Sequence, residues 1–321
     1  MTSGSADERR VLVAMLTYRR PECLVRALPV LVEQAGTLAL PAEILVVDND
    51  PAGGAAAEVA RWADQGVRYA HEPKPGISAA RNKALDLAQD HDAIVFLDDD
   101  DLPTPPWLRR LVDAWGEWDC DGVGGPLRPE LPAPDRWIEA SGVFRRTVRP
   151  TGSRIERAAT NNLLLSTAAL RRYGLRFDER LGLIGGEDAL LTHQLTSRGG
   201  DLRWCDEAEI VSPVPASRMN RGWVVRRIFR AGGSWSQMEL AVASGRRQRA
   251  RVVASLVVRA VGNIALGSAR ALVATARGQF EPRVRASCTV ISYAGLLLGL
   301  LGYVHPEYRR PEPTGSTPAA T

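Results

Sequence analysis

Four consecutive aspartates, residues 98–101, have the clearest potential for chemistry in this sequence. They directly follow the apolar run 94–97, so four carboxylates meet at the end of an expected buried strand. Adjacent carboxylates repel one another unless a cation or hydrogen-bond donors compensate them. Mg²⁺ and Mn²⁺ take oxygen ligands and often share them with substrate phosphates. The run therefore predicts a metal site for a diphosphate, and the alternative is a solvated acidic loop before the next helix.

Acidic residues also occur at the end of another expected strand and at the start of an expected helix. Asp48 follows the apolar run 43–47, where a short acceptor can bind a nucleobase N–H or a ribose hydroxyl, or can simply form a turn. Glu187 and Asp188 follow two glycines and open an expected helix over 187–197. A carboxylate there can act as a general base, although the helix dipole alone also favours acids in a first turn. Both interpretations stay open on these residues alone.

The first third of the chain alternates short apolar runs with amphipathic segments. Strands are expected at 11–16, 43–47, 67–71 and 93–97, and helices at 24–32, 59–62 and 77–88. This alternation predicts a mainly parallel sheet with ligands at the carboxyl ends of its strands, where Thr17, Asp48 and the aspartate run all lie. Arg81 follows a glycine turn at a helix start, a place suited to phosphate.

The chain becomes less regular after residue 125. We expect a loop-rich excursion over 126–150, periodic structure again from about 161–165, and a strand pair at 202–204 and 209–211. Beyond Pro215 acidic residues nearly vanish and the pattern predicts helices.

Composition excludes several classes of protein. The chain has 321 residues, of which 45% are hydrophobic and 24% charged, which fits neither a disordered chain nor a disulfide scaffold. Four scattered cysteines and four histidines argue against a zinc cluster and for reduced thiols. The polar residues 1–10 predict no signal peptide. After the first strand the sequence reads Thr-Tyr-Arg-Arg-Pro, without the glycines of a triphosphate loop or a dinucleotide site.

The net charge of +4 conceals a strongly basic third of the chain. Residues 218–285 carry 14 arginines and two acids, whereas residues 1–217 carry 25 basic and 33 acidic groups. We expect an anionic partner for the basic third, and because few aromatics interleave with its arginines we favour a membrane surface over nucleic acid. The alternative is that these helices pack on the rest of the chain or form a homodimer interface.

Two segments of the basic third have distinct patterns. On a helix at about 100° per residue, arginines 251, 259, 270 and 277 share an arc of roughly 100°, with an apolar face beside it. Residues 286–304 carry no charge, and a spanning helix needs ~20 apolar residues. This segment is expected to span a membrane, to lie in its interface, or to complete the globule as a buried hairpin.

The order of these motifs resembles the inverting glycosyltransferases of family 2, which have a GT-A fold. That fold is an α/β, Rossmann-like, mainly parallel sheet flanked by helices, here followed by an α-helical C-terminal extension. The resemblance covers about residues 10–218, and its matching segments are residues 16–21, 46–49, 76–82, 96–101, 161–164, 186–188 and 214–215 with Arg218.

The resemblance implies a metal-dependent enzyme that moves a sugar from a nucleoside-diphosphate sugar, above all a UDP-sugar, to an acceptor hydroxyl. Asp100 would bind Mn²⁺ or Mg²⁺, and Asp188, with Glu187 beside it, would deprotonate the acceptor. The product would have inverted configuration, with no covalent intermediate. The residues implied in nucleotide-sugar binding are Thr17, Tyr18, Arg19, Asp48, Arg81, Asp98, Asp99 and Asn162.

Two departures from the family pattern matter. The aspartate run is longer than usual, so the metal register can shift among Asp99, Asp100 and Asp101. Ser212 stands where many relatives carry a histidine or an acid, which leaves the third metal ligand and the acceptor class open.

These expectations divide the chain into a catalytic domain over 1–217, an Arg-rich helical extension over 218–310 and a disordered tail over 311–321. We expect a cytoplasmic enzyme, peripheral on the inner face of the cytoplasmic membrane, that makes surface polysaccharide, glycolipid or natural-product glycosides. The alternative is a membrane-associated carbohydrate-binding or scaffold protein whose transferase site has decayed, and the retained Asp48, aspartate run and Asp188 argue against it.

Overall fold

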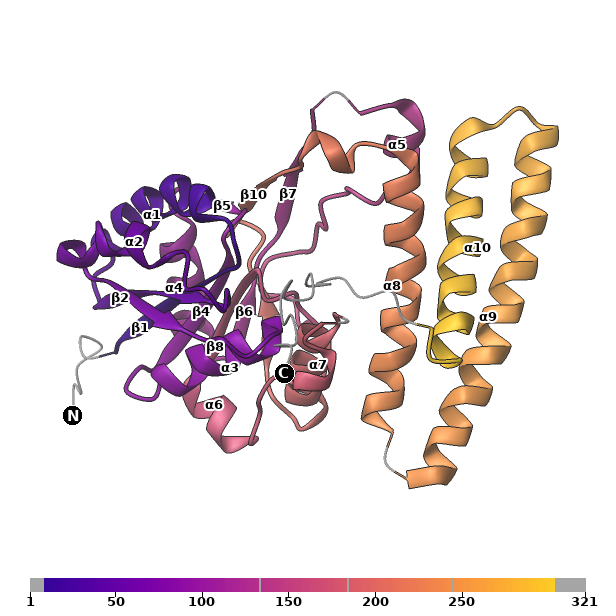
Figure 1. Ribbon diagram of the computed structural model, residues 1–321. Helices are drawn as coiled ribbons and strands as arrows, with labels where there is room; N and C mark the ends of the chain where they lie inside the picture. Colours follow the sequence, from indigo (N-terminus) through magenta and orange to yellow (C-terminus); the bar gives the residue numbers. More distant parts are fainter. Residues whose placement is uncertain (1–8, 133, 184, 244, 304–321) are drawn as a thin grey trace, which may run out of the picture.

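Seven strands form the central sheet, in the order β3-β2-β1-β4-β8-β6-β9. The computed structural model describes residues 9–132, 134–183, 185–243 and 245–303 (Figure 1). Strands β1 to β4 are parallel to one another, whereas β8 runs antiparallel to both β4 and β6. The strands are β1 Val11–Thr17, β2 Ala42–Asp48, β3 Val67–His71, β4 Ala93–Asp98, β6 Gly122–Gly124, β8 Asn162–Ser166 and β9 Leu202–Trp204.

Helices cover both faces of this sheet, which is why its strands are apolar without alternation. All seven residues of β1 are buried. One face packs on α1 and α4, and the other packs on α3, α6 and α7. The helices of this part are α1 Pro21–Gly36, α2 Ala56–Ala60, α3 Ile77–Leu87, α4 Trp107–Trp118, α5 Arg136–Ser141, α6 Thr167–Arg172 and α7 Glu187–Ser197, with short 3-10 turns at Ala63–Gln65, Glu179–Leu181 and Ala216–Arg218.

The register of the parallel strands brings the expected site residues to one edge. Thr17 is paired with Asp48, and Leu16 is paired with Asp98. Thr17, Asp48 and the aspartate run therefore end neighbouring strands at the same level, as the sequence predicts.

A second, three-stranded sheet corrects two expectations about the middle of the chain. Its order is β5-β10-β7, from Leu102–Pro103, Ile210–Pro213 and Leu127–Glu130. The expected loop over 126–150 thus contains strand β7 and helix α5. The strands expected to pair at 202–204 and 209–211 lie in different sheets, because β9 continues the central sheet beside β6 while β10 pairs with β5 and β7. Strands this short carry too few alternating residues to reveal their partners.

The C-terminal third forms three long helices: α8 Arg221–Val242, α9 Gly245–Ala276 and α10 Phe280–Leu300. Helix α10 lies between α8 and α9 (Figure 1). The described part of the uncharged segment, residues 286–303, therefore lies mostly inside this bundle. This placement favours a buried segment over one that spans a membrane or lies in its interface. The end of the expected extension and the expected tail, residues 304–321, lie outside the described residues.

Backbone contact fixes α8 against α10. A Cβ at Gly232 would lie 1.9 Å from the carbonyl oxygen of Ser292, and a Cβ at Gly295 would lie 1.9 Å from that of Phe229. Only glycine permits so close an approach of two helix backbones. Two glycines of the uncharged segment, Gly295 and Gly299, are thus required by packing, whereas a Cβ at Gly302 would meet nothing within 4 Å.

This contact predicts opposite effects for two Gly→Ala changes in the bundle. Gly295→Ala forces α8 and α10 apart, and overpacking of this kind costs about 1–3 kcal/mol in the free energy of unfolding. Gly262→Ala in α9 meets nothing within 4 Å, so the better helix propensity of alanine should leave stability equal or raise it by up to ~1 kcal/mol. Denaturant unfolding of both variants measures this. Equal stability of the two variants would contradict the packing described here.

Candidate active site

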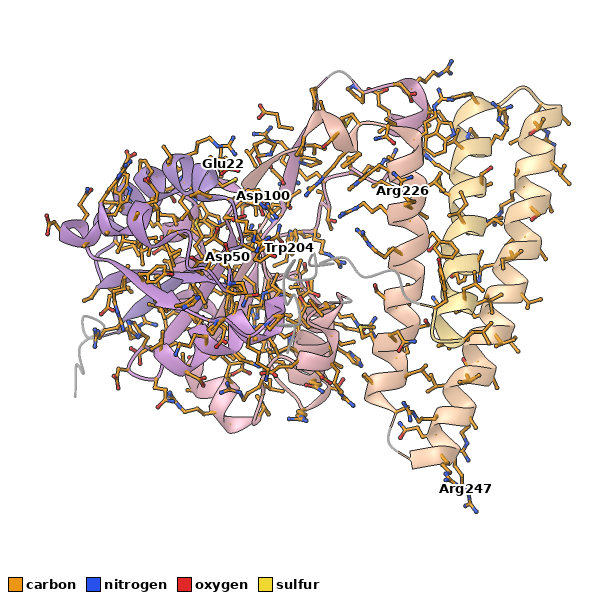
Figure 2. The ribbon with its side chains drawn as sticks, viewed as in Figure 1. Glu22, Asp50, Asp100, Trp204, Arg226 and Arg247 are labelled. Atoms are coloured by element: carbon orange, nitrogen blue, oxygen red, sulfur yellow. The ribbon has the colours of Figure 1, made fainter. Side chains whose placement is uncertain are left out.

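A cavity of about 520 Å³ opens at the carboxyl ends of β1 and β4. The loop residues Thr17, Tyr18 and Arg20 line one part of it, and residues 98–101 line another. Asp100 lies on the side of the α/β domain that faces α8 (Figure 2). We call this space the first cavity.

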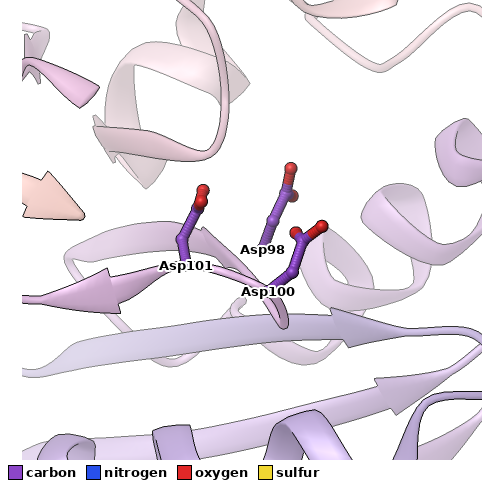
Figure 3. A group of neighbouring side chains, drawn as sticks. All are labelled: Asp98, Asp100 and Asp101. Atoms are coloured by element: carbon purple, nitrogen blue, oxygen red, sulfur yellow. The ribbon is translucent and has the colours of Figure 1, made fainter. Parts of the chain in front are cut away.

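Three of the four aspartates converge in the first cavity. Oxygens of Asp98, Asp100 and Asp101 all lie within 4.8 Å of one another, and the three carboxylates point to the same side of the strand end (Figure 3). Ligand oxygens of Mg²⁺ lie about 2 Å from the ion, so small side-chain rotations would let these three share one cation. The all-oxygen donor set fits Mg²⁺ or Mn²⁺. Asp100, the expected metal residue, belongs to this group together with Asp98 and Asp101.

Asp99 also lines this cavity but is not part of the converging group. Thr17 Oγ1 donates a hydrogen bond to Asp99 Oδ2 over 2.7 Å, and Arg20 Nη1 lies 3.3 Å from Asp99 Oδ1. The same Arg20 nitrogen lies 2.8 Å from Asp100 Oδ2. Asp99 therefore ties the end of β1 to the end of β4, which makes it the member of the run least suited to a metal.

Burial and crowding make these acids hard to ionise. Burial raises the pKa of Asp101 to about 8, repulsion from Asp98 adds to the rise, and hydrogen bonds from Ser212 and Asn161 oppose it. The pKa of Asp98 is also raised, first by withdrawal from bulk water, while nearby Arg81 lowers it. A bound cation would relieve this repulsion. Ser212, which stands where many relatives carry a histidine or an acid, thus hydrogen-bonds to Asp101, one of the three candidate ligands.

Three expected nucleotide-sugar residues, Asp48, Asn162 and Arg19, lie outside the lining of both cavities of the site, and a fourth, Arg81, lines only the second cavity described below. Asp48 is fully buried, and its carboxylate accepts hydrogen bonds from the backbone of Asp50 and Ala55 and from the Tyr69 hydroxyl. Asn162 is 1% exposed and bonds to the Trp107 indole and to two backbone carbonyls.

The third of these residues, Arg19, has a φ of 55° and pairs with Asp50 at 3.2 Å. Its neighbour Arg20 points to the aspartates instead. Binding roles for Arg19, Asp48 and Asn162 stay predictions, and each side chain already has a structural role.

A second cavity, of about 480 Å³, contains the expected catalytic acids. Glu187 and Asp188 both line it, at the N-terminus of α7. Glu187 forms a buried ion pair with Arg81, whose guanidinium also lies 3.7 Å from Asp98 Oδ1. Burial raises the pKa of Glu187 to about 7 against the effect of Arg81. Arg81 thereby links the aspartate group to the acids of the second cavity.

The two cavities share part of their walls. Asp98, Leu127, Asn161 and Arg227 line both of them. The aspartate group and Asp188 therefore lie in adjacent cavities that have these four residues in common.

Several residues of the site come from the basic third of the chain, for which the sequence predicted an anionic partner outside the protein. Arg218, Trp223, Arg227 and Arg230 line the first cavity. A signal for them existed, since four carboxylates need counter-charges and residues 218–230 hold five arginines without an acid. The domain boundary at residue 217 stays a prediction. Helix α8 follows that boundary in the sequence and still contributes residues to the site.

The comparisons with known proteins agree with this geometry. Residues 12–176 match the family described as glycosyl transferase family 2. The succinoglycan biosynthesis protein ExoM of Rhizobium meliloti (strain 1021) is 32% identical over 301 residues, which are 90% of this chain and 92% of that protein. The chain belongs to glycosyl transferase family 2, and it is a glycosyltransferase.

Solved structures confirm the GT-A fold. The mannosyltransferase PcManGT of Pyrobaculum calidifontis, in complex with GDP-Man and Mn²⁺, is 17% identical with a TM-score of 0.58, over 91% of this chain and 88% of that chain. S. aureus TarS 1–349, in complex with UDP-GlcNAc, is 14% identical with a TM-score of 0.52, over 87% of this chain and 91% of that chain. A longer TarS chain is covered over 41% of its length.

Three buried acids of the site predict how stability depends on pH. Burial raises the pKa of Asp99 to about 7, of Asp101 to about 8 and of Glu187 to about 7, whereas the unfolded chain holds such groups at about 4. The folded state therefore binds more protons than the unfolded state across this interval. The contribution of these groups to the free energy of unfolding is fully present below pH ~4 and is lost as the pH rises through 7 and 8.

We expect the Tm of the protein in a metal chelator to fall between pH 5.5 and 8.5 by differential scanning calorimetry, and Mn²⁺ to reduce the fall. Asp101→Asn should flatten the profile, whereas Asn at the exposed Asp113 should leave it unchanged. A Tm that rises over this interval in wild type would contradict the burial of these carboxyls.

Proposed function

We propose that this glycosyltransferase moves a sugar from a nucleoside-diphosphate sugar, with a UDP-sugar as the expected donor, to a hydroxyl of a growing surface polysaccharide or glycolipid. The observation that carries the proposal is the wall shared by the two cavities, with the aspartate group on one side and Asp188 on the other. The relative whose name refers to succinoglycan biosynthesis supports a polysaccharide acceptor.

The charge of the first cavity suits a diphosphate. Its lining holds four aspartates and four arginines, so a divalent cation leaves it with a net positive charge. Mn²⁺ or Mg²⁺, held by Asp98, Asp100 and Asp101, would offset charge on the departing nucleoside diphosphate. Arg218, Arg227 and Arg230 add guanidinium donors, which bind phosphate oxygens in bidentate fashion. The Mn²⁺ in a structural relative makes that ion the first to test.

Asp188 is the proposed general base. It lies at the N-terminus of α7, where the helix dipole favours the charged carboxylate. The acceptor hydroxyl gives its proton to Asp188 as its oxygen bonds to the anomeric carbon, and the bond from that carbon to the diphosphate oxygen breaks on the opposite face. One such displacement inverts the configuration. Arg81 holds Glu187 beside the base and keeps its carboxylate out of the reaction path.

The second cavity is the proposed acceptor site. Besides the two acids, Arg145, Arg149 and Arg157 line it. Arg157 pairs with Glu239 of α8 at 3.3 Å, which leaves the other two to face an acceptor. These arginines favour an acceptor that carries phosphate or carboxylate groups close to the accepting hydroxyl.

Donor binding predicts a metal-dependent thermal shift. We expect one of UDP, GDP, TDP and CDP, with Mn²⁺, to raise the Tm of wild type, since a ligand at 100 times its Kd stabilises by about 2.7 kcal/mol. Asp100→Ala should abolish the shift, and Asp113→Ala, a matched change at an exposed aspartate, should retain it. No shift with any nucleotide would remove the support for this donor site and favour a non-catalytic scaffold.

The base predicts a loss of turnover without a loss of donor affinity. Asp188→Asn keeps the shape of the side chain but cannot take a proton, so we expect the rate of sugar transfer to fall about 10²–10⁴-fold. The nucleotide thermal shift of this variant should equal that of wild type. A variant that keeps more than a tenth of wild-type turnover would assign the base to another group.

A further inference from the structure

Helix α9 turns a broad apolar face outward. Six of its large hydrophobic side chains are exposed: Val257, Val258, Val261, Leu266, Leu272 and Val273. Its buried residues, including Leu256, Ala260 and Ala274, face α10 instead. At about 100° per residue, Val258, Val261 and Leu272 lie on the side opposite these buried positions. Within the described chain this face has no covering element, and α9 is at the edge of the molecule (Figure 1).

Arginines border this apolar face. Arg259 and Arg270 of α9, and Arg277 just after it, lie on one flank between the inward and outward faces. The N-terminal turns add Arg246, Arg247, Arg249 and Arg251, of which Arg247 lies at the far end of the bundle (Figure 2). No acidic residue occurs between Glu239 and Glu281. The exposed surface of α9 is thus apolar at its centre and uniformly basic at its edge and end.

This pattern distinguishes a helix that lies on a membrane from one that crosses it. By length and composition α9 could span a bilayer, and 17% of its most apolar window is buried. Its longest run without charge, however, is residues 260–269 between Arg259 and Arg270, half of the ~20 residues that a span needs. A helix with an apolar face and a basic flank is typical of one that lies in the plane of the interface.

The same charges argue against a second copy of this chain as the covering partner. Two α9 helices packed face to face would bring arginine flanks of the same sign together, with no acid on either helix to compensate them. Anionic headgroups, in contrast, provide the missing charge and leave the apolar side chains in the boundary with the acyl chains.

We propose that the outward face of α9 docks on the surface of an anionic lipid bilayer. Val258, Val261 and Leu272 enter the interfacial layer, while Arg259, Arg270 and Arg277 bind headgroup phosphates. The inference does not depend on the donor or the acceptor, and it places membrane contact on α9 rather than on the uncharged residues of α10, which are packed between helices.

Sedimentation of the full-length protein with vesicles tests this surface. We expect wild type to bind vesicles that contain phosphatidylglycerol at low salt, to bind pure phosphatidylcholine weakly, and to dissociate as salt rises. The double variant Val258→Asp/Leu272→Asp should bind at least about tenfold more weakly, because it places two charges in the interfacial layer. Gln at arginines 259, 270 and 277 should weaken binding to the anionic vesicles about 100-fold, or about fivefold for each arginine.

Matched changes on the α/β domain provide the controls. Val25→Asp alters an exposed valine of α1, and Gln at Arg61, Arg154 and Arg180 removes three exposed arginines; neither should change vesicle binding. Circular dichroism and the nucleotide thermal shift verify that each variant is folded.

Two results would overturn the proposal. In the first, wild type stays in the supernatant with anionic vesicles at low salt, or the α9 double variant binds them as wild type does. In the second, light scattering finds a wild-type dimer that Val258→Asp/Leu272→Asp dissociates, which would make a second copy the partner of α9.

Discussion

The density of negative charge at the end of β4 is the constraint on which the site depends. Four carboxylates on consecutive residues cannot all remain charged and uncompensated in a partly buried cavity. The protein separates them: Asp99 turns to Thr17 and Arg20, Asp101 accepts from Asn161 and Ser212, and Asp98 lies near Arg81. Asp100 remains half-buried between Arg20 and Arg218. Distant segments of the chain therefore meet at this point because each supplies a donor or a positive charge.

This constraint also explains the uneven charge of the chain. The basic third divides its arginines between two surfaces, one formed by α8 and the loop before it, and one formed by α9. Arg218, Arg227 and Arg230 line the first cavity together with the four aspartates, and Arg218 lies 4.0 Å from Asp100 Oδ2. The arginines of α9 have no such acids nearby in sequence. The excess of arginine in the basic third is thus divided between two separate surfaces of the structure.

Much of the fold could be predicted because buried parallel strands, and the glycine turns before α3 and α7, leave local patterns. Strand β3 and helix α7 have the predicted bounds, and the other strands of the first third agree within two residues. The direction of single side chains could not be predicted in the same way. Asn161 lies in the turn before β8 and Asn162 is the first residue of that strand, and Asn161 rather than Asn162 lines the cavity.

Arg19 and Arg20 differ for a similar reason, since the left-handed backbone at Arg19 reverses the chain before Arg20. Asp48 fits the motif of a ligand acceptor, but its partners Ala55 and Tyr69 come from later turns and strands that a local pattern does not specify. Tertiary contacts of this kind decide which polar side chain remains available to a ligand.

The contact of glycine backbones between α8 and α10 has a mechanical consequence. Because no side chains separate the two helices at Gly232 and Gly295, rotamer changes cannot absorb a relative displacement there. The helices must translate and rotate together, and α8 carries Arg227 and Arg230 into the first cavity. The placement of the whole bundle against the α/β domain therefore sets where these two side chains start out toward the first cavity.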